Sequence, residues 1–221
     1  MNITENISAV VLDLDGVMVD SETIALEMWR EFLALYGKAL SDAEYRQMVG
    51  MEPRKTAIFV RQRTGIPIGV EEILEDHRTR VMEAVSRDAE PVDGLAHFIR
   101  EARLRGLPVG VASNSGTTYV DQVLRAIGLR EAFDCVITAD QVARAKPAPD
   151  IYHAAAASLK TEPERCLAIE DSPIGMKSAL SAGMRCVVIP NHHLDGADFS
   201  GAYAMFDSFP ALLREFDFVL Q

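Results

Sequence analysis

The sequence has few cysteines and no long apolar segment. Its three cysteines, Cys135, Cys166 and Cys186, each begin a short apolar run typical of a buried strand. A disulfide framework or a zinc site needs cysteines at characteristic spacings, so these three predict small core residues in a reducing cytoplasm. No apolar stretch approaches the ~20 residues that span a bilayer. No basic region followed by an apolar core begins the chain, so we expect a cytoplasmic protein without a signal peptide.

Positive charge is also scarce. Lysine and arginine number 22 against 33 aspartates and glutamates, which gives a formal net charge of −11. This balance argues against a broad surface for nucleic acid or for an anionic membrane. It does not exclude a phosphorylated substrate, because lysines and a metal ion can reverse the field within a cleft. With 221 residues, the chain can form one large domain or a domain that carries a smaller one.

Hydrophobic periodicity divides the chain into two kinds of segment. Residues 21–87 show helical spacing without strand signals, whereas residues 88–221 alternate between helical spacing and short apolar runs. Such alternation builds a parallel sheet covered by helices on both faces, and the apolar run 9–12 adds a first strand. We therefore predict the α/β class, with a Rossmann-like parallel-sheet core of residues 1–20 and 88–221 and an inserted all-helical cap domain of residues 21–87. The further strands are expected at 107–112, 135–138, 166–169 and 186–189.

Two carboxylates follow the first predicted strand directly. Asp13 and Asp15 are two residues apart, so an extended chain would place their side chains side by side, and Gly16 would let the backbone turn at once. Paired carboxylates repel each other unless a cation or a shared proton lies between them. A surface turn is one alternative. A calcium loop is another, but it would need several spaced acids and a closing glutamate, which the apolar strand and Leu14 do not fit.

Polar residues also follow three later segments, and each has a plainer interpretation. Ser113 and Asn114 end the 107–112 strand and suit an anionic oxygen near a helix N-terminus, or form an ordinary helix cap. Lys146 precedes Pro-Ala-Pro-Asp and is pre-ordered at a helix start, or is simply solvated. Glu170 and Asp171 follow the 166–169 strand as a second acidic pair, or cap a helix. Because functional groups gather at the carboxyl ends of parallel strands, we expect these residues to meet there.

These four segments resemble, in order, the motifs of the haloacid dehalogenase-like superfamily, and the resemblance spans nearly the whole chain. The first motif, Asp-Leu-Asp-Gly-Val at 13–17, is similar to that of the sugar-phosphate phosphatase and β-phosphoglucomutase branch. The resemblance implies that Asp13 is the nucleophile and Asp15 the general acid and base. It also implies that Lys146 clamps the nucleophile and phosphate. The implied phosphate-binding residues are Ser113, Asn114 and Lys146, and the implied metal-binding residues are Asp13, Asp15 (through its backbone carbonyl), Glu170 and Asp171.

The activity implied is that of a Mg²⁺-dependent phosphatase of a small phosphorylated metabolite, a sugar phosphate, acting through an aspartyl-phosphate. The alternative is a β-phosphoglucomutase-like phosphomutase. Such mutases carry a histidine where this chain has Ala25, and their cap arginine falls one residue out of step with Arg54, so both departures favour hydrolysis. A non-catalytic relative is a third possibility, which the intact motif residues disfavour.

Substrate choice is expected to lie in the cap, because every phosphate monoester presents the same phosphoryl group to the core. The segment Gly50–Lys55 places Arg54 and Lys55 near a break between helices. The specificity candidates are Glu22, Arg54, Lys55 and His77. Solvated charges in the first turn of a helix are the alternative for the two bases. We expect a monomer that acts on a small molecule and binds neither nucleic acid nor membrane.

Overall fold

The computed structural model describes residues 6–48, 51–191, 194 and 196–217. The chain forms two compact units. The first contains Met1–Asp20 and Glu90–Gln221, and the second contains Ser21–Ala89. No helix within the described ranges is both long and apolar enough to cross a membrane.

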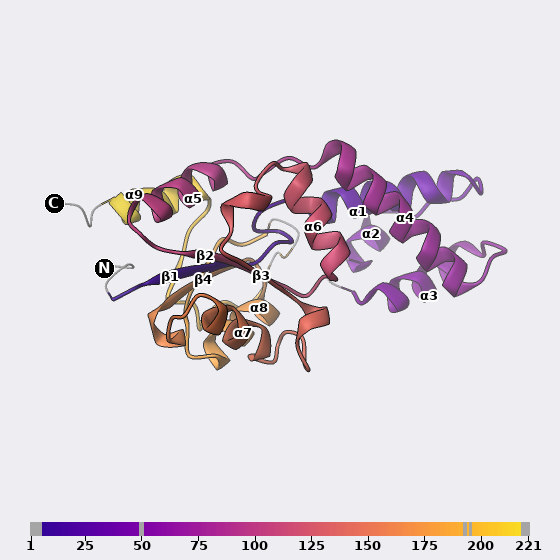
Figure 1. The fold of residues 1–221 in the computed structure, drawn as a ribbon. Helices are drawn as coiled ribbons and strands as arrows, with labels where there is room; N and C mark the ends of the chain where they lie inside the picture. The colour runs from indigo at the N-terminus through magenta and orange to yellow at the C-terminus, as the bar shows by residue number, and fades with distance from the viewer. Residues whose placement is uncertain (1–5, 49–50, 192–193, 195, 218–221) are drawn as a thin grey trace. The chain divides into compact units, whose positions relative to one another are not determined.

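The first unit is built on a parallel sheet (Figure 1), whose strands lie in the order β3-β2-β1-β4-β5-β6. Every pairing between neighbours is parallel. The strands are β1 (Ala9–Leu12), β2 (Val109–Ser113), β3 (Cys135–Thr138), β4 (Cys166–Glu170), β5 (Arg185–Val188) and β6 (Ala204–Met205). The predicted α/β class with a parallel sheet is therefore confirmed. The two-residue β6 was not predicted, because so short a strand leaves no periodic signal.

Helices cover both faces of this sheet. Figure 1 shows α5 and α9 on one face and α7 and α8 on the other. The helices of this unit are α5 (Leu95–Leu104), α6 (Thr117–Ala126), α7 (Asp150–Ser158), α8 (Pro173–Ser181) and α9 (Phe209–Asp217). Single 3₁₀ turns lie at η1 (Arg130–Ala132), η2 (Ala139–Gln141) and η3 (Pro163–Arg165). Because both faces are covered, β1, β2 and β4 are buried along their whole length.

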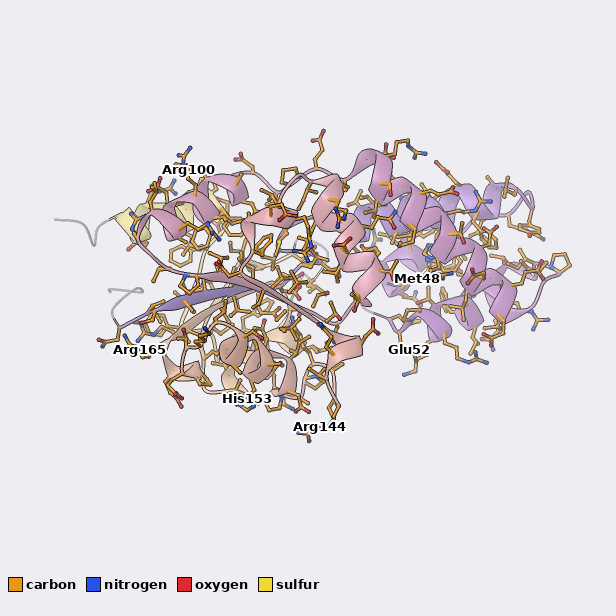
Figure 2. The ribbon with its side chains drawn as sticks, viewed as in Figure 1. Met48, Glu52, Arg100, Arg144, His153 and Arg165 are labelled. Atoms are coloured by element: carbon orange, nitrogen blue, oxygen red, sulfur yellow. The ribbon has the colours of Figure 1, made fainter. Side chains whose placement is uncertain are left out.

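The core separates by face, as the alternation of side chains along a strand requires. Ala9 and Val11 of β1 belong to one cluster with Tyr152 of α7 and Met176 of α8. His153 of α7 and Arg144 of the preceding loop project away from the sheet (Figure 2), and Arg144 forms an ion pair with Asp150, the first residue of α7, at 2.8 Å.

The second unit is all helical. Its helices are α1 (Ser21–Ala34), α2 (Asp42–Met48), α3 (Pro53–Thr64) and α4 (Val70–Asp88). They bury an apolar cluster that includes Trp29, Phe32, Tyr45, Val60 and Ile73. The proline at the first position of α3 suits a helix start, because its missing N–H has no partner there in any case.

Substituting Phe209 tests the packing of α9 on the first unit. Phe209 is fully buried, and its ring lies 5.3 Å from the ring of Phe98 on α5. We expect Phe209→Ala to lower the free energy of unfolding by about 3–5 kcal/mol, since it leaves a cavity that neighbours fill only in part. Urea denaturation measures the change. Leu104→Ala is the matched control, because Leu104 is 74% exposed. Equal effects from the two variants would contradict this account of the core.

Candidate active site

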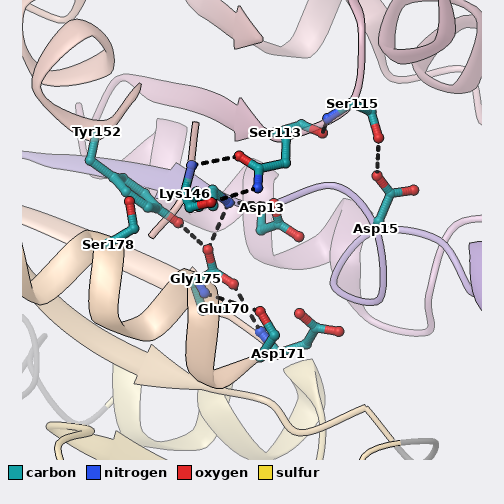
Figure 3. A network of polar contacts seen from close by, with 12 residues as sticks. Asp13, Asp15, Ser113, Ser115, Lys146, Tyr152, Glu170, Asp171, Gly175 and Ser178 are labelled. Atoms are coloured by element: carbon teal, nitrogen blue, oxygen red, sulfur yellow. Dashed lines mark hydrogen bonds and ion pairs between the residues drawn. The ribbon is translucent and has the colours of Figure 1, made fainter. Parts of the chain in front are cut away.

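A buried lysine lies between two carboxylates at the carboxyl edge of the sheet (Figure 3). Asp13 is the first residue after β1, and its backbone N–H donates to Ile169 of the neighbouring β4 at 3.0 Å. Lys146 Nζ donates to Asp13 Oδ1 at 2.5 Å and to Glu170 Oε1 at 2.7 Å. The side chain of Lys146 is only 4% exposed. An ammonium group buried this deeply requires paired carboxylates, so the three charges form one interdependent group.

Asn114 holds the backbone of Lys146. The side-chain oxygen of Asn114 accepts from the backbone N–H of Lys146 at 2.8 Å, and its amide nitrogen donates to the Lys146 carbonyl at 3.2 Å. These two bonds join the loop after β2 to the loop before α7. The family resemblance implies that Asn114 is a phosphate-binding residue. Its side chain has a further task, which is to hold the main chain of the lysine in place.

Glu170 is fully buried at the end of β4. Besides the ammonium of Lys146, its Oε1 accepts from the hydroxyl of Tyr152 at 2.5 Å, and its Oε2 accepts from the backbone N–H of Asp171 at 3.3 Å. Lys146 Nζ also lies 5.0 Å from the centre of the Tyr152 ring. With both oxygens engaged, Glu170 is held in one orientation and fixes the ammonium in turn.

Two glycines make room for this acidic pair. A Cβ on Gly16 would come within 1.9 Å of Asp171 Oδ2, and Gly16 has a φ of +84°, which side chains rarely adopt. A Cβ on Gly175, in the first turn of α8, would come within 2.0 Å of the Glu170 carboxylate. The backbone therefore approaches both acids more closely than any other residue type would allow.

Burial dominates the protonation of the cluster. It raises the pKa of Asp13 well above its usual range, and the positive charge of Lys146 only partly offsets this. Burial, followed by the charge of Glu170, raises the pKa of Asp171 to about 7. Burial alone would lower the pKa of Lys146, but Asp13 and Glu170 outweigh it and raise that pKa. The cluster thus holds more negative charge than one ammonium balances, which favours binding of a further cation.

The donor set fits a hard divalent cation. Asp13, Glu170 and Asp171 each offer a carboxylate oxygen, these atoms lie within 4.8 Å of one another, and all three residues are buried. Carboxylate oxygens are the ligands that Mg²⁺ prefers, and Mg²⁺ commonly uses one or two of them together with waters and substrate phosphate. This geometry suits Asp13 and Asp171 as ligands, with Glu170 already bonded to Lys146 and Tyr152.

Asp15 lies apart from that group of three carboxylates. Its Oδ2 accepts from the Ser115 hydroxyl at 2.7 Å and its Oδ1 from the Tyr119 hydroxyl at 3.1 Å. Strand β1 ends at Leu12, so Asp13 and Asp15 both lie beyond it. The side-by-side placement of their side chains, expected for an extended chain, stays a prediction.

Ser113 is the last residue of β2 and is fully buried. Its Oγ accepts from the backbone N–H of Ser115 at 3.0 Å. This bond uses the hydroxyl as an acceptor, and the same hydroxyl can donate to an anionic oxygen. The sheet therefore brings Asp13, Ser113, Lys146 and Glu170 to one edge, from segments that are far apart in the sequence.

The specificity candidates lie in the helical unit. Glu22 is the second residue of α1, Lys55 is exposed on α3, and Arg54 forms an ion pair with Glu71 of α4. Gly50, at the start of the same expected segment, lies outside the described residues.

His77 is engaged in packing within that unit. Its ring stacks on Trp29 at a centroid distance of 3.8 Å, and its Nε2 lies 3.1 Å from the Ala25 carbonyl. Burial lowers the pKa of His77 to about 4, so the ring is neutral at pH 7. These contacts join α1 to α4.

Sequence reasoning did not single out Tyr152, Ser115 or Tyr119. Tyr152 falls on the apolar face of α7, where its spacing is that of an ordinary core residue. Ser115 and Tyr119 follow Ser113 closely, but nothing local marks them as partners of a residue 100 or more positions earlier. A hydroxyl two residues after a candidate phosphate-binding serine was the one available signal.

Comparisons with known proteins agree with this geometry. A family model described as haloacid dehalogenase-like hydrolase matches residues 7–183. Protein CbbY from Cereibacter sphaeroides is 33% identical over 217 residues, covering 93% of this chain and 94% of the relative. Hexitol phosphatase B from Escherichia coli (strain K12) is 29% identical over 193 residues, covering 86% of each. The crystal structure of CbbY from Rhodobacter sphaeroides in complex with phosphate is 31% identical, with a TM-score of 0.80 and coverage of 96% of this chain and 99% of that one.

Calorimetric titration with Mg²⁺ tests the cation site directly. We expect Asp171→Asn to weaken binding by at least about tenfold, the smaller end of the loss seen even for residues that only orient metal ligands. Asp198→Asn is the matched control, because Asp198 is exposed in a loop and should leave Mg²⁺ affinity unchanged. Unaltered affinity in the Asp171 variant would remove this carboxylate from the cation site.

Proposed function

The chain belongs to the haloacid dehalogenase-like hydrolases, and from that premise we propose that it is a Mg²⁺-dependent phosphatase of a small phosphorylated metabolite, a sugar phosphate. The observation that carries the proposal is the pairing of Lys146 with Asp13 and Glu170 at 2.5 and 2.7 Å. A nucleophilic carboxylate that attacks a phosphate dianion needs positive charge beside it, because both partners are negative. Lys146 supplies that charge within a buried edge of the sheet.

In the first half of the reaction an oxygen of Asp13 attacks phosphorus. The bond between phosphorus and the leaving oxygen breaks as the new bond forms, and the phosphoryl group passes to Asp13 as an aspartyl-phosphate. Asp15 gives its proton to the leaving oxygen, so that the product departs as a neutral alcohol. Lys146, the Ser113 hydroxyl and the backbone N–H of Asn114 offset the charge on the transferring oxygens.

In the second half Asp15 acts in the opposite direction. It takes a proton from a water molecule, whose oxygen attacks the phosphorus of the aspartyl-phosphate. Inorganic phosphate leaves, Asp13 is restored as a carboxylate, and Asp15 is again protonated for the next turnover. One residue therefore serves as acid and then as base.

The residues that would hold Mg²⁺ are Asp13 and Asp171 with the backbone carbonyl of Asp15, and Glu170 supports them through Lys146. When bound, the ion would offset negative charge on the phosphoryl oxygens and help to orient the phosphoryl group. The fit rests on the three buried carboxylates and on the raised pKa values of Asp13 and Asp171.

The relatives support a small phosphorylated substrate. One of them is named for hexitol phosphatase activity, and the structure of another is described in complex with phosphate. We assign substrate preference to residues of the helical unit, with Glu22, Arg54, Lys55 and His77 as candidates. The phosphomutase alternative calls for a cap histidine where this chain has Ala25. Assays of phosphate release and of glucose-1-phosphate isomerisation, run on the same sample, distinguish the two activities.

Removing the nucleophile should abolish turnover. Asp13→Asn cannot form the acyl-phosphate, because a neutral amide is a poor nucleophile, and we expect kcat to fall by more than about 10³-fold. Phosphate release from a panel of sugar phosphates measures the loss, and circular dichroism checks the fold. If the folded variant kept more than about a thousandth of the wild-type kcat, Asp13 would not be the nucleophile.

Substitutions at Arg54 and Lys55 test the assignment of specificity. We expect Arg54→Ala or Lys55→Ala to raise KM for the best sugar phosphate of the panel far more than KM for p-nitrophenyl phosphate. The aryl ester has no hydroxyl-bearing body for these cations to bind. Lys38→Ala, which removes another exposed charge of the helical unit, serves as the control. Proportionate changes for both substrates, or none for either, would exclude these residues from substrate selection.

A further inference from the structure

Two hydroxyl groups hold the carboxylate of Asp15, one on each oxygen. Ser115 Oγ donates to Oδ2 at 2.7 Å and Tyr119 OH donates to Oδ1 at 3.1 Å. Both donors come from one short segment, because Ser115 lies two residues beyond β2 and Tyr119 is the third residue of α6. Figure 3 shows the Asp15 side chain directed at Ser115, with the Asp13–Lys146–Glu170 group to one side.

This donor segment is itself fixed to the sheet. The backbone N–H of Thr117 donates to Asp140 Oδ2 at 2.7 Å, and the hydroxyls of Thr117 and Thr138 lie 2.7 Å apart. The backbone N–H of Ser115 donates to Ser113 Oγ at 3.0 Å. The end of β3 and the end of β2 therefore both anchor the start of α6, which places the two hydroxyls at set positions.

The partners of Asp15 differ in kind from those of Asp13. Asp13 is paired with an ammonium group, whereas the hydroxyl partners of Asp15 are uncharged. A hydroxyl can both donate and accept a hydrogen bond. It donates to an ionised carboxylate and can accept from a protonated one by rotating its O–H bond. An ammonium group can only donate, and its positive charge favours the ionised form.

We propose that Ser115 and Tyr119 are positioning residues that hold the carboxyl group of Asp15 in one orientation, with one hydroxyl on each of its oxygens. The inference rests on the proposed function, which requires Asp15 to carry a proton in one half-reaction and to lack it in the next. The two residues do not touch phosphorus in this account. They act through Asp15, by keeping its carboxyl group directed to the leaving oxygen while the proton passes to that oxygen and is later taken from water.

The test compares two esters whose leaving groups differ in their need for a proton. A sugar alkoxide is strongly basic and must be protonated as it leaves, whereas p-nitrophenolate is a stable anion that leaves without a proton. The ratio kcat/KM reports the steps up to release of the leaving group, and excludes hydrolysis of the aspartyl-phosphate. We expect Tyr119→Phe and Ser115→Ala together to lower kcat/KM for a sugar phosphate by about tenfold or more, a part of the roughly 10²–10⁴-fold that acid–base catalysis contributes. For p-nitrophenyl phosphate we expect a loss below about threefold, because acid–base catalysis contributes little to its departure.

Control variants separate this inference from a purely structural role. Tyr203→Phe removes a tyrosine hydroxyl elsewhere in the first unit and should leave kcat/KM unchanged for both esters. Ser115→Thr keeps a hydroxyl and should therefore retain most of the wild-type kcat/KM for the sugar phosphate. Thermal melts verify that each variant folds. If the double variant does not fold, Tyr119→Phe alone, which keeps the aromatic ring, still tests the inference. Equal losses for both esters in a folded variant would indicate a structural role and overturn the inference.

Asp15→Asn distinguishes failure of the inference from failure of the proposed function. If Asp15→Asn selectively impairs the sugar phosphate while the Ser115 and Tyr119 variants match the wild type, the positioning role is wrong and the acid role of Asp15 stands. If Asp15→Asn impairs both esters equally or neither, Asp15 is not the acid, and the inference falls with that assignment. If Asp15→Asn, Ser115→Ala and Tyr119→Phe each impair the sugar phosphate selectively, the result supports both the acid role of Asp15 and the positioning role of the two hydroxyls.

Discussion

The candidate site depends on one buried interaction, the ammonium of Lys146 held between the carboxylates of Asp13 and Glu170. Burying three charges is costly unless each is paired and further hydrogen-bonded. The structure meets that condition through Tyr152 on Glu170 and through Asn114 on the main chain of Lys146. Removing Lys146 would leave two buried carboxylates without a positive partner. The ends of β1 and β4 and the loop before α7 together supply these paired charges.

A second constraint is the division of the acidic residues into two environments. Asp13, Glu170 and Asp171 lie together, where burial and mutual repulsion favour a cation. Asp15 lies outside that group and is held by neutral hydroxyls. These environments suit the proposed roles, in which Asp13 attacks as a carboxylate beside a cation and Asp15 gains and loses a proton. Gly16, directly after Asp15, lets the backbone approach Asp171.

Close backbone approach is the third element of the site. Gly175 lies so near Glu170 that a single added carbon would overlap its carboxylate. The Gly175 backbone of α8 and the Tyr152 side chain of α7 therefore both confine the Glu170 carboxylate (Figure 3). This confinement explains how an acid at the end of a buried strand keeps a single orientation without exposure to water.

The sequence by itself determined the class of the fold and which strand ends carry polar residues. Apolar runs such as 9–12 and 166–169 are local patterns, and parallel strands must present their carboxyl ends at one edge of a sheet. Only the tertiary structure decided which side chains meet there. It showed that Ser115 and Tyr119 are partners of Asp15, that the Asn114 side chain holds Lys146, and that Tyr152 is a partner of Glu170. Those contacts join residues 18 to 104 positions apart, and no local spacing records a pairing that packing alone creates.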